Sequence, residues 1–243
     1  MPRLIPLEPT RKHGRCRLCG DLVPLTKTHV PAKSAGNVGS SRRPMINFEK
    51  SGRATYALGS ERLGGMNGYW FCETCNNSCT RPWDEEYTRW VPSLFNALHD
   101  PSSNGNTIEA KAVDFDAGAY VRCLWAWFFA TSDGLLDRIP QIAAAVRSGE
   151  AVEPPNYPRL YLGATRELQF SMLIGRFGAG IAAPPYVAFL TTPATEEHAM
   201  RMLDTSPWLK RGAGERREET LRLPIIETLG DEGLPMLGEP VLE

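Results

Sequence analysis

The pattern of hydrophobic positions divides the chain into two segments of different character. Residues 1–92 contain few long apolar runs and are rich in Arg, Gly and Cys, whereas the chain after residue 108 has apolar stretches with regular spacing. A cluster of Pro, Ser, Asn and Gly at 99–107 lies between them and has the composition of a linker. The pattern therefore predicts two domains, residues 1–98 and residues 108–243.

The second segment predicts an α+β domain with two helices and a mostly antiparallel sheet. Residues 113–130 are apolar on nearly all sides of a helix, which favours a buried helix, and residues 135–147 continue at helical spacing. A shorter helical pattern lies at 194–206. Short apolar runs with strand-like composition lie at 159–165, 168–177, 186–192 and 221–229.

Four aromatic residues gather in the first of these helices, Trp125, Trp127, Phe128 and Phe129. Aromatic side chains can stack on nucleobases. Their all-apolar surroundings instead favour packing, either in the core or in a homodimer interface formed by the C-terminal domain.

The composition is that of a globular protein, with 42% hydrophobic and 23% charged residues. The N-terminus has no apolar segment of a secretory signal. The most apolar stretch, 123–132, is only ten residues long, whereas a membrane span needs about 20. We therefore expect a cytoplasmic protein that does not bind membranes, and cysteines that serve as thiols or metal ligands rather than in disulfides.

The formal net charge of −1 conceals an asymmetry along the chain. Residues 1–62 hold twelve Lys and Arg against four acidic residues, and the last 33 residues hold eight acids against four arginines. A basic first segment suggests a polyanionic partner. The alternative is a solvated charged surface without a partner.

Two Cys-x-x-Cys pairs in the first segment predict a metal site. Each pair, Cys16 with Cys19 and Cys72 with Cys75, brings two thiolates to one turn, and two such turns form a tetrahedral sulfur site suited to zinc. Gly20 follows the first pair and permits a tight turn. Unrelated thiols or a redox pair are the alternatives, and Cys79 or His13 could each replace one ligand.

With these cysteines, the fragments CRLCG, THVPAKSAGN and CETCNNS resemble an HNH endonuclease of the ββα-metal superfamily. The resemblance covers residues 15–90 and is closest to the zinc-knuckle branch. It implies a treble-clef-like domain in which a structural zinc ion holds a β-hairpin against a short helix. It also implies hydrolysis of DNA phosphodiester bonds, in settings such as restriction or anti-phage defence.

The resemblance also implies roles for single residues. His29 falls on the general base that deprotonates a water molecule, and a pKa near 6.5 suits that task. Asn67 falls on the residue that braces the loop and orients the histidine. Asn76, or alternatively Asn77, falls on the ligand of a catalytic Mg²⁺ or Mn²⁺ ion, which takes oxygen ligands. A helix N-cap is the alternative for Asn76, and a turn residue before Gly68 is the alternative for Asn67.

One residue departs from the family pattern. Many relatives have Asp, Glu or His before the catalytic histidine, where this chain has Thr28, and a hydroxyl is a weaker cation ligand than a carboxylate. Two other functions therefore stay open, a non-catalytic zinc module that binds nucleic acid and a zinc-pinned protein-interaction domain. For the nuclease, the expected partner is double-stranded DNA, and its phosphates would contact Lys27, Lys33, Arg42, Arg43, Lys50 and Arg53.

Overall fold

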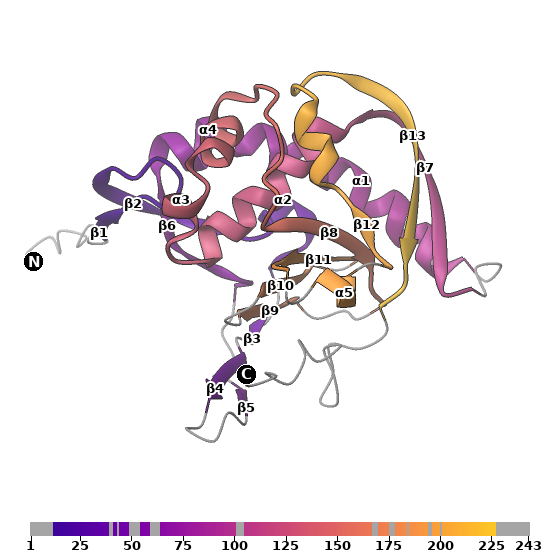
Figure 1. The fold of residues 1–243 in the computed structure, drawn as a ribbon, viewed down its shortest axis with the longest axis horizontal. Coiled ribbons are helices and arrows are strands. Elements are labelled where there is room, and N and C mark those ends of the chain that lie inside the picture. Colours follow the sequence, from indigo (N-terminus) through magenta and orange to yellow (C-terminus); the bar gives the residue numbers. More distant parts are fainter. Residues whose placement is uncertain are drawn as a thin grey trace, which may run out of the picture.

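The fold is described from a computed structural model. It describes residues 12–38, 41–42, 44–48, 54–58, 64–100, 105–166, 170–174, 178–183, 185–193, 196–199 and 201–226. Figure 1 shows the arrangement, with a small three-stranded sheet at one end of the long axis and a two-stranded pair at the other.

The small sheet is formed by the segments that carry the two cysteine pairs. Strands β1 (His13–Arg15), β2 (Leu22–His29) and β6 (Asn67–Cys72) are antiparallel, in the order β1-β2-β6. A π-helical turn, η2 (Thr74–Cys79), follows β6 directly and leads into helix α1 (Arg81–His99). Pro82 lies in the first turn of α1, where its missing N–H costs no helical hydrogen bond. The second cysteine pair therefore lies at the junction of a strand and a helix.

The segment between β2 and β6 has its own secondary structure. A short 3-10 turn, η1 (Lys33–Ala35), precedes strands β3 (Ser41–Arg42), β4 (Pro44–Phe48) and β5 (Ala54–Leu58). β4 and β5 form an antiparallel hairpin, and β3 pairs in parallel with β9 of the C-terminal half. The segment between the cysteine pairs thus reaches across to the other half of the chain.

The C-terminal half begins with strand β7 (Thr107–Asp116) and helix α2 (Ala117–Thr131), followed by helices α3 (Leu135–Arg138) and α4 (Pro140–Ser148). A six-stranded sheet has the order β12-β8-β11-β10-β9-β3, and β13 (Arg216–Pro224) pairs with β7. The remaining elements are β8 (Arg159–Ala164), β9 (Phe170–Ile174), β10 (Gly178–Ala183), β11 (Tyr186–Thr191), α5 (Glu196–Ala199), β12 (Leu203–Asp204) and the 3-10 turn η3 (Ser206–Lys210).

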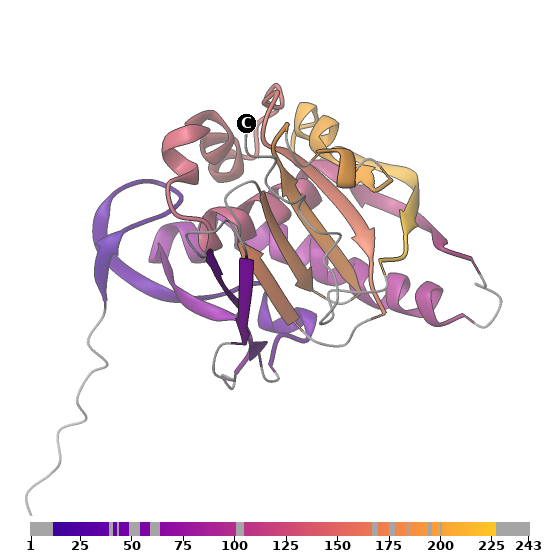
Figure 2. The same ribbon diagram turned by 60° about the horizontal axis from the view of Figure 1, so that its bottom comes forward.

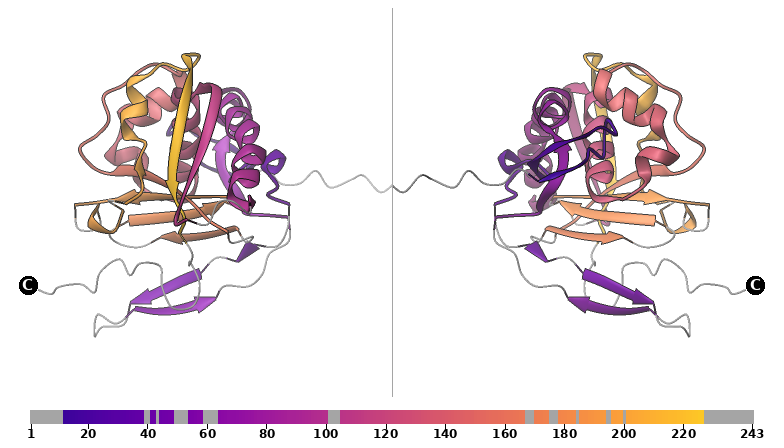
Figure 3. Two further views of the ribbon diagram at one scale, coloured as in Figure 1. Left: turned by 90° about the vertical axis from the view of Figure 1, so that its right-hand side faces the viewer. Right: turned by 90° about the vertical axis from the view of Figure 1, so that its left-hand side faces the viewer.

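Helix α2 is the centre of the core, because every residue from Ala117 to Thr131 is buried. Figure 2 shows it beside the strands of the six-stranded sheet, and Figure 3 shows the helices on one side of that sheet with the β4–β5 hairpin on the other. One cluster of buried hydrophobic residues includes both Phe71 of β6 and Trp125 of α2. The two predicted segments therefore share a continuous core, while their division at 98/108 stays a prediction.

The expected α+β class with antiparallel sheets is confirmed, but several boundaries were wrong. Residues 113–116 belong to β7, so the buried helix begins four residues later than predicted. The expected helix 135–147 is interrupted at Ile139, before Pro140, which begins α4. Within the expected helix at 194–206, the described residues form α5 and strand β12. In the described part of the chain no helix has the length and hydrophobicity that a membrane span requires.

Candidate metal centre and adjoining polar site

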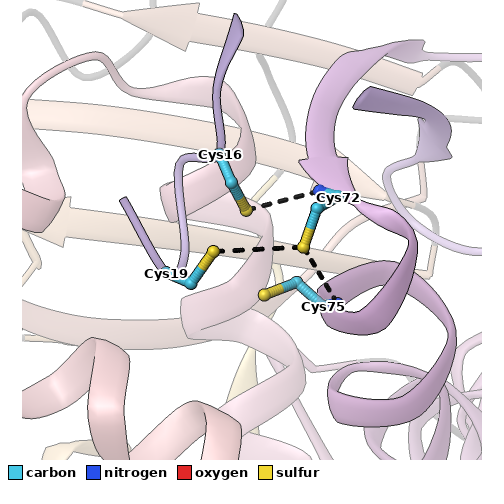
Figure 4. A group of neighbouring side chains, drawn as sticks. All are labelled: Cys16, Cys19, Cys72 and Cys75. Carbon is cyan, nitrogen blue, oxygen red and sulfur yellow. Dashed lines mark hydrogen bonds between the residues drawn. The ribbon is translucent and has the colours of Figure 1, made fainter. Parts of the chain in front are cut away.

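The sulfur atoms of four cysteines converge on one point. Those of Cys16, Cys19, Cys72 and Cys75 all lie within 4.8 Å of one another (Figure 4). The Sγ atoms of Cys19 and Cys72 are 3.9 Å apart. A tetrahedral zinc ion with Zn–S bonds of about 2.3 Å places its sulfur ligands about 3.8 Å apart. The cluster can therefore hold a metal ion such as zinc.

Backbone hydrogen bonds shape both turns of this cluster. In the first, the Gly20 N–H donates to the Cys16 carbonyl at 2.9 Å, and Gly20 has a φ of +87°, which a residue with a side chain rarely adopts. In the second, the Cys75 N–H donates to the Cys72 sulfur at 3.4 Å. The Cys72 N–H also donates to the Cys16 sulfur, at 3.3 Å, which links the two turns. N–H groups directed at sulfur stabilise thiolates, the form that binds metal.

Burial and the proximity of the other thiols shift the pKa values of Cys16, Cys19 and Cys75. A hydrogen bond from the Cys75 thiol lowers the pKa of Cys16 to about 4, and this same hydrogen bond is the largest cause that raises the pKa of Cys75. Burial raises the pKa of Cys19 to about 12. Without a cation, the cluster thus favours one thiolate stabilised by protonated neighbours. A divalent ion supplies the positive charge that lets several sulfurs ionise together.

The other candidate ligands lie outside this cluster. His13 is exposed on β1, and the Cys123 thiol is buried in α2, where it donates to Asp84. Cys79, one helical turn after Cys75, is not among the four convergent sulfurs, although a hydrogen bond with Cys75 affects its pKa. It lines an open pocket of about 440 Å³ with Cys19, Cys72 and Arg147. Among the described residues, the four cysteines form the one group of three or more His, Cys, Asp or Glu suited to a metal.

His29 is the last residue of β2, at the end of the β2–β6 pair opposite to Cys72. Its side chain is half-buried, and the Nε2 atom is buried from solvent with no hydrogen-bond partner among the described residues. Burial lowers the pKa of the imidazole, and the positive charges of Lys33 and Lys27 lower it further, while a hydrogen bond with the Gly64 backbone acts in the opposite direction. The ring is therefore neutral at neutral pH and retains an unpaired nitrogen.

Asn67 is the first residue of β6 and the cross-strand partner of His29. Its Nδ2 donates to the Gly64 carbonyl at 3.1 Å and to the Gly65 carbonyl at 2.9 Å. Asn67 thus fixes the same turn whose Gly64 backbone contacts the His29 ring. It supports the histidine through this turn.

Asn76 extends from η2 to strand β2. Its Nδ2 lies 3.5 Å from the Lys27 carbonyl, two residues before His29. Since Asn76 lies within η2, after Thr74 and Cys75, it is not the N-cap of that turn. The neighbouring Asn77 is exposed. Of the two asparagines, Asn76 is the one held against β2.

A further asparagine, which the sequence reasoning did not single out, holds the two strand ends together. Asn37 is fully buried; its Nδ2 donates to the carbonyls of Pro31 and Met66, at 2.7 and 3.0 Å, and its Oδ1 accepts from the Met66 N–H at 2.7 Å. A Cβ at Gly65 would lie 2.1 Å from Asn37 Oδ1, which explains the glycine there. The run of Gly36 and Asn37 after the His-Val-Pro segment was the available signal.

Thr28 is buried, and its Oγ1 has no hydrogen-bond partner among the described residues. Successive residues of a strand point to opposite faces, so the Thr28 hydroxyl is directed away from the face of His29. Thr28 therefore does not occupy the place of a metal-binding carboxylate beside the imidazole.

Of the six predicted phosphate contacts, Lys27 and Lys33 are exposed and close enough to His29 to affect its pKa. Arg42 belongs to β3, but its side chain lies outside the described part of the structure, as do Arg43, Lys50 and Arg53. Two other basic residues are neutralised. Arg15 forms two hydrogen bonds with the Asp137 carboxylate, at 2.6 and 2.8 Å, and Arg17 pairs with Asp133 at 2.5 Å.

No protein-family model, curated protein or solved structure gives a significant match to this chain. The case for a function therefore rests on the residues and their geometry, and the HNH resemblance stays a hypothesis drawn from the sequence.

Proposed function

We propose that the chain is a metal-dependent endonuclease of the HNH type, which hydrolyses phosphodiester bonds of DNA. The observation that carries the proposal is that His29 and Asn67 pair across β2 and β6, while Asn76, from the η2 turn that follows the other end of β6, reaches the Lys27 carbonyl two residues before His29. Two antiparallel strands, a helix and a thiol cluster at their junction are the parts that the resemblance requires. In this chain the two strands are far apart in sequence, because residues 30–66 lie between the end of β2 and the start of β6.

In this proposal the four cysteines hold a structural zinc ion. Cys72 and Cys75 end β6 and begin η2, whereas Cys16 and Cys19 lie in the turn between β1 and β2. One ion bound to all four would fix the start of the helical segment relative to both strands. Because the binding free energy of a structural zinc ion contributes to folding, the ion stabilises the site without entering the reaction.

His29 acts as the general base. Its lowered pKa keeps the imidazole neutral, and Nε2, which is buried and unpaired in the described structure, would accept a proton from a water molecule that enters with the substrate and attacks the phosphorus atom. Asn67 holds the turn at Gly64 and thereby the orientation of the ring. Lys27 and Lys33 place positive charge where the phosphates of a substrate would lie.

Asn76 is the protein ligand of a catalytic Mg²⁺ or Mn²⁺ ion. With Nδ2 directed at the Lys27 carbonyl, the amide leaves Oδ1 as an acceptor without a partner among the described residues. A hard divalent cation suits such an oxygen, and Mg²⁺ ordinarily keeps several water molecules and substrate oxygens in its shell. When bound, the ion would offset the charge that develops on the leaving oxygen.

A second function, binding of nucleic acid without cleavage, is favoured by one observation. The Thr28 hydroxyl is buried, so of Thr28 and Asn76 only Asn76 stays in place as an oxygen ligand for the catalytic ion. If that one ligand does not retain the ion, the basic surface would still bind phosphates. The two functions differ in the outcome of a cleavage assay.

Supercoiled plasmid tests the proposal. The protein as purified should nick it only with added Mg²⁺ or Mn²⁺, and His29→Ala should lower the rate by about 10²–10⁴-fold, the usual contribution of a general base. Asn76→Ala should also abolish the response to divalent ions, whereas Asn77→Ala serves as the exposed control beside it. Nicking that survives His29→Ala would refute the base, and salt-sensitive binding with no nicking would favour the second function.

A further inference from the structure

Tyr69 has no part in the chemistry proposed above, although it lies on β6, the strand that begins with Asn67 and pairs with β2. It is 38% exposed, on β6, and the ammonium group of Lys12 lies 5.1 Å from the centre of its ring. A large aromatic ring exposed on a sheet is a surface on which a flat apolar group can stack.

The pairing of β2 with β6 puts this ring on the face of the candidate site. Tyr69 is the cross-strand partner of Lys27, and Asn67 is the partner of His29. Residues two apart on a strand share a face, so Lys27 and His29 lie on one face with their partners. Tyr69 is therefore two residues along the ladder from the His29–Asn67 pair, or about 7 Å along the strands.

The lysines on this surface have no counter-charges in the described structure. Lys12, Lys27 and Lys33 form no ion pair with a described carboxylate, in contrast to Arg15 and Arg17 of the same basic segment, which pair with Asp137 and Asp133. These three lysines therefore leave positive charge uncompensated on the surface that carries Tyr69 and His29. It complements a polyanion.

We infer that Tyr69, Lys12 and Lys27 form a stacking position for an unpaired nucleobase next to the cleaved bond, so that the site takes single-stranded nucleic acid or an unpaired segment of a duplex. This inference rests on the proposed function for the position of the cleaved bond. It goes beyond that function because it specifies the substrate, a strand with an unpaired base.

The energetics favour the base over the lysine as the partner of the ring. A base stacked on an aromatic side chain gains more than a solvent-exposed cation–π contact does, so the base displaces the Lys12 ammonium. The flexible side chain of Lys12 then contacts a neighbouring phosphate. In a duplex the bases are stacked on one another and cannot reach Tyr69, whereas the phosphates still meet Lys27. The ring thus adds affinity for single strands alone.

Fluorescence anisotropy of labelled oligonucleotides tests the inference with the full chain, in low salt and without Mg²⁺ or Mn²⁺, so that no cleavage occurs. The probes are a DNA strand of about 12 nucleotides, the matching RNA strand and the DNA duplex. Tyr69→Thr, which keeps a residue that favours strands, should weaken single-strand binding about tenfold and change duplex binding less than twofold. Tyr69→Phe should bind single strands within twofold of wild type.

Two further variants make the test specific. Tyr157→Thr is the matched control, because Tyr157 has the same 38% exposure but lies away from β6, and it should leave binding unchanged. Lys12→Gln should lessen the salt dependence of single-strand binding by about one released counterion, and it tests the surface even if Tyr69→Thr does not fold. DNA and RNA arms with equal losses support a position that reads the base and not the sugar.

The outcomes separate this inference from the proposed function. Equal loss of duplex and single-strand binding in Tyr69→Thr, or no loss in either, overturns the stacking position even if the plasmid is nicked. A loss confined to single strands supports it even if no cleavage is found, in which case the nuclease proposal falls. Absence of binding to all three probes overturns both.

Discussion

His29 and Asn67 are cross-strand partners, the last residue of β2 and the first of β6. The two are separated in sequence by residues 30–66, which include the β4–β5 hairpin, yet the register of the sheet places them side by side. Asn67 fixes the carbonyls of Gly64 and Gly65, and the backbone of Gly64 contacts the imidazole. The sheet register and one turn therefore set the orientation of the candidate base.

Lys27→Gln should shift the pH dependence of cleavage to higher pH. Burial and the charges of Lys33 and Lys27 lower the pKa of His29 below its ordinary value of 6.5, and a general base acts when neutral. The rate in single-turnover experiments should therefore fall on the acid side with a midpoint below 6.5. Removing the Lys27 charge raises the pKa of His29 and moves that midpoint up.

Lys12→Gln is the matched control for this pH profile, because Lys12 is exposed on the same surface but is not among the causes of the shift at His29. It should weaken binding and leave the midpoint unchanged. A midpoint that moves to lower pH in Lys27→Gln would contradict His29 as the titrating base.

Replacing one convergent cysteine should remove the bound metal. The wild-type protein should contain one zinc ion per chain by elemental analysis, because four sulfurs meet at one point. Cys72→Ser removes the thiol that contacts both Cys19 and the Cys75 N–H, so the zinc should be lost and the protein destabilised. Cys79→Ser lies in the same η2 turn outside the four sulfurs and should retain the zinc. Equal zinc contents in the two variants would contradict the site.

The cysteine cluster could be predicted from the sequence because the two cysteines of each pair are separated by only two residues. Each Cys-x-x-Cys pair forms one turn, and the chemistry of thiolates then brings the two pairs together. The position of Asn67 opposite His29 depends instead on the register of two distant strands. That register is held by Asn37, whose role requires knowledge of where Met66 lies.

Helix boundaries were predicted less well, for a different reason. The apolar run of 113–130 has the composition of either a buried helix or a buried strand, and tertiary pairing of β7 with β13 makes its first residues a strand. Of the two placements left open for the aromatic cluster, the core and a dimer interface, the core is the one observed, since Trp125, Trp127, Phe128 and Phe129 are all buried within the chain. Burial was readable from composition, whereas the backbone conformation at the boundary was not.

Asn37→Ala should destabilise the fold by about 2–4 kcal/mol. The substitution removes hydrogen bonds to Pro31 and Met66 and leaves the Met66 N–H unpaired inside the protein. Urea unfolding followed by circular dichroism measures the change in the free energy of unfolding. Asn77→Ala, an exposed asparagine in η2, is the control and should change it by less than about 0.5 kcal/mol. Equal effects in both variants would contradict the role of Asn37.

Asp84→Asn should stabilise the protein increasingly as the pH rises. Burial raises the pKa of the Asp84 carboxyl to about 7, although the Cys123 thiol donates to it, whereas an unfolded chain has a pKa near 3.9. Between these values the folded protein holds a proton that the unfolded chain releases, so wild-type stability falls as the pH rises and levels off above about 7. The asparagine variant lacks this loss.

The measured quantity is the difference in unfolding free energy between Asp84→Asn and wild type, obtained from urea titrations between pH 5.5 and 8.5. Taking the difference cancels the titration of His29 and of the cysteines, which the two proteins share. It should grow by up to about 1.4 kcal/mol per pH unit below pH 7 and stay level above it. Asn77→Ala, which removes no titratable group, is the control and should give a difference that does not vary with pH. A difference for Asp84→Asn that is equally flat would mean that Asp84 is ionised in the folded protein and that its contact with α2 is hydrated.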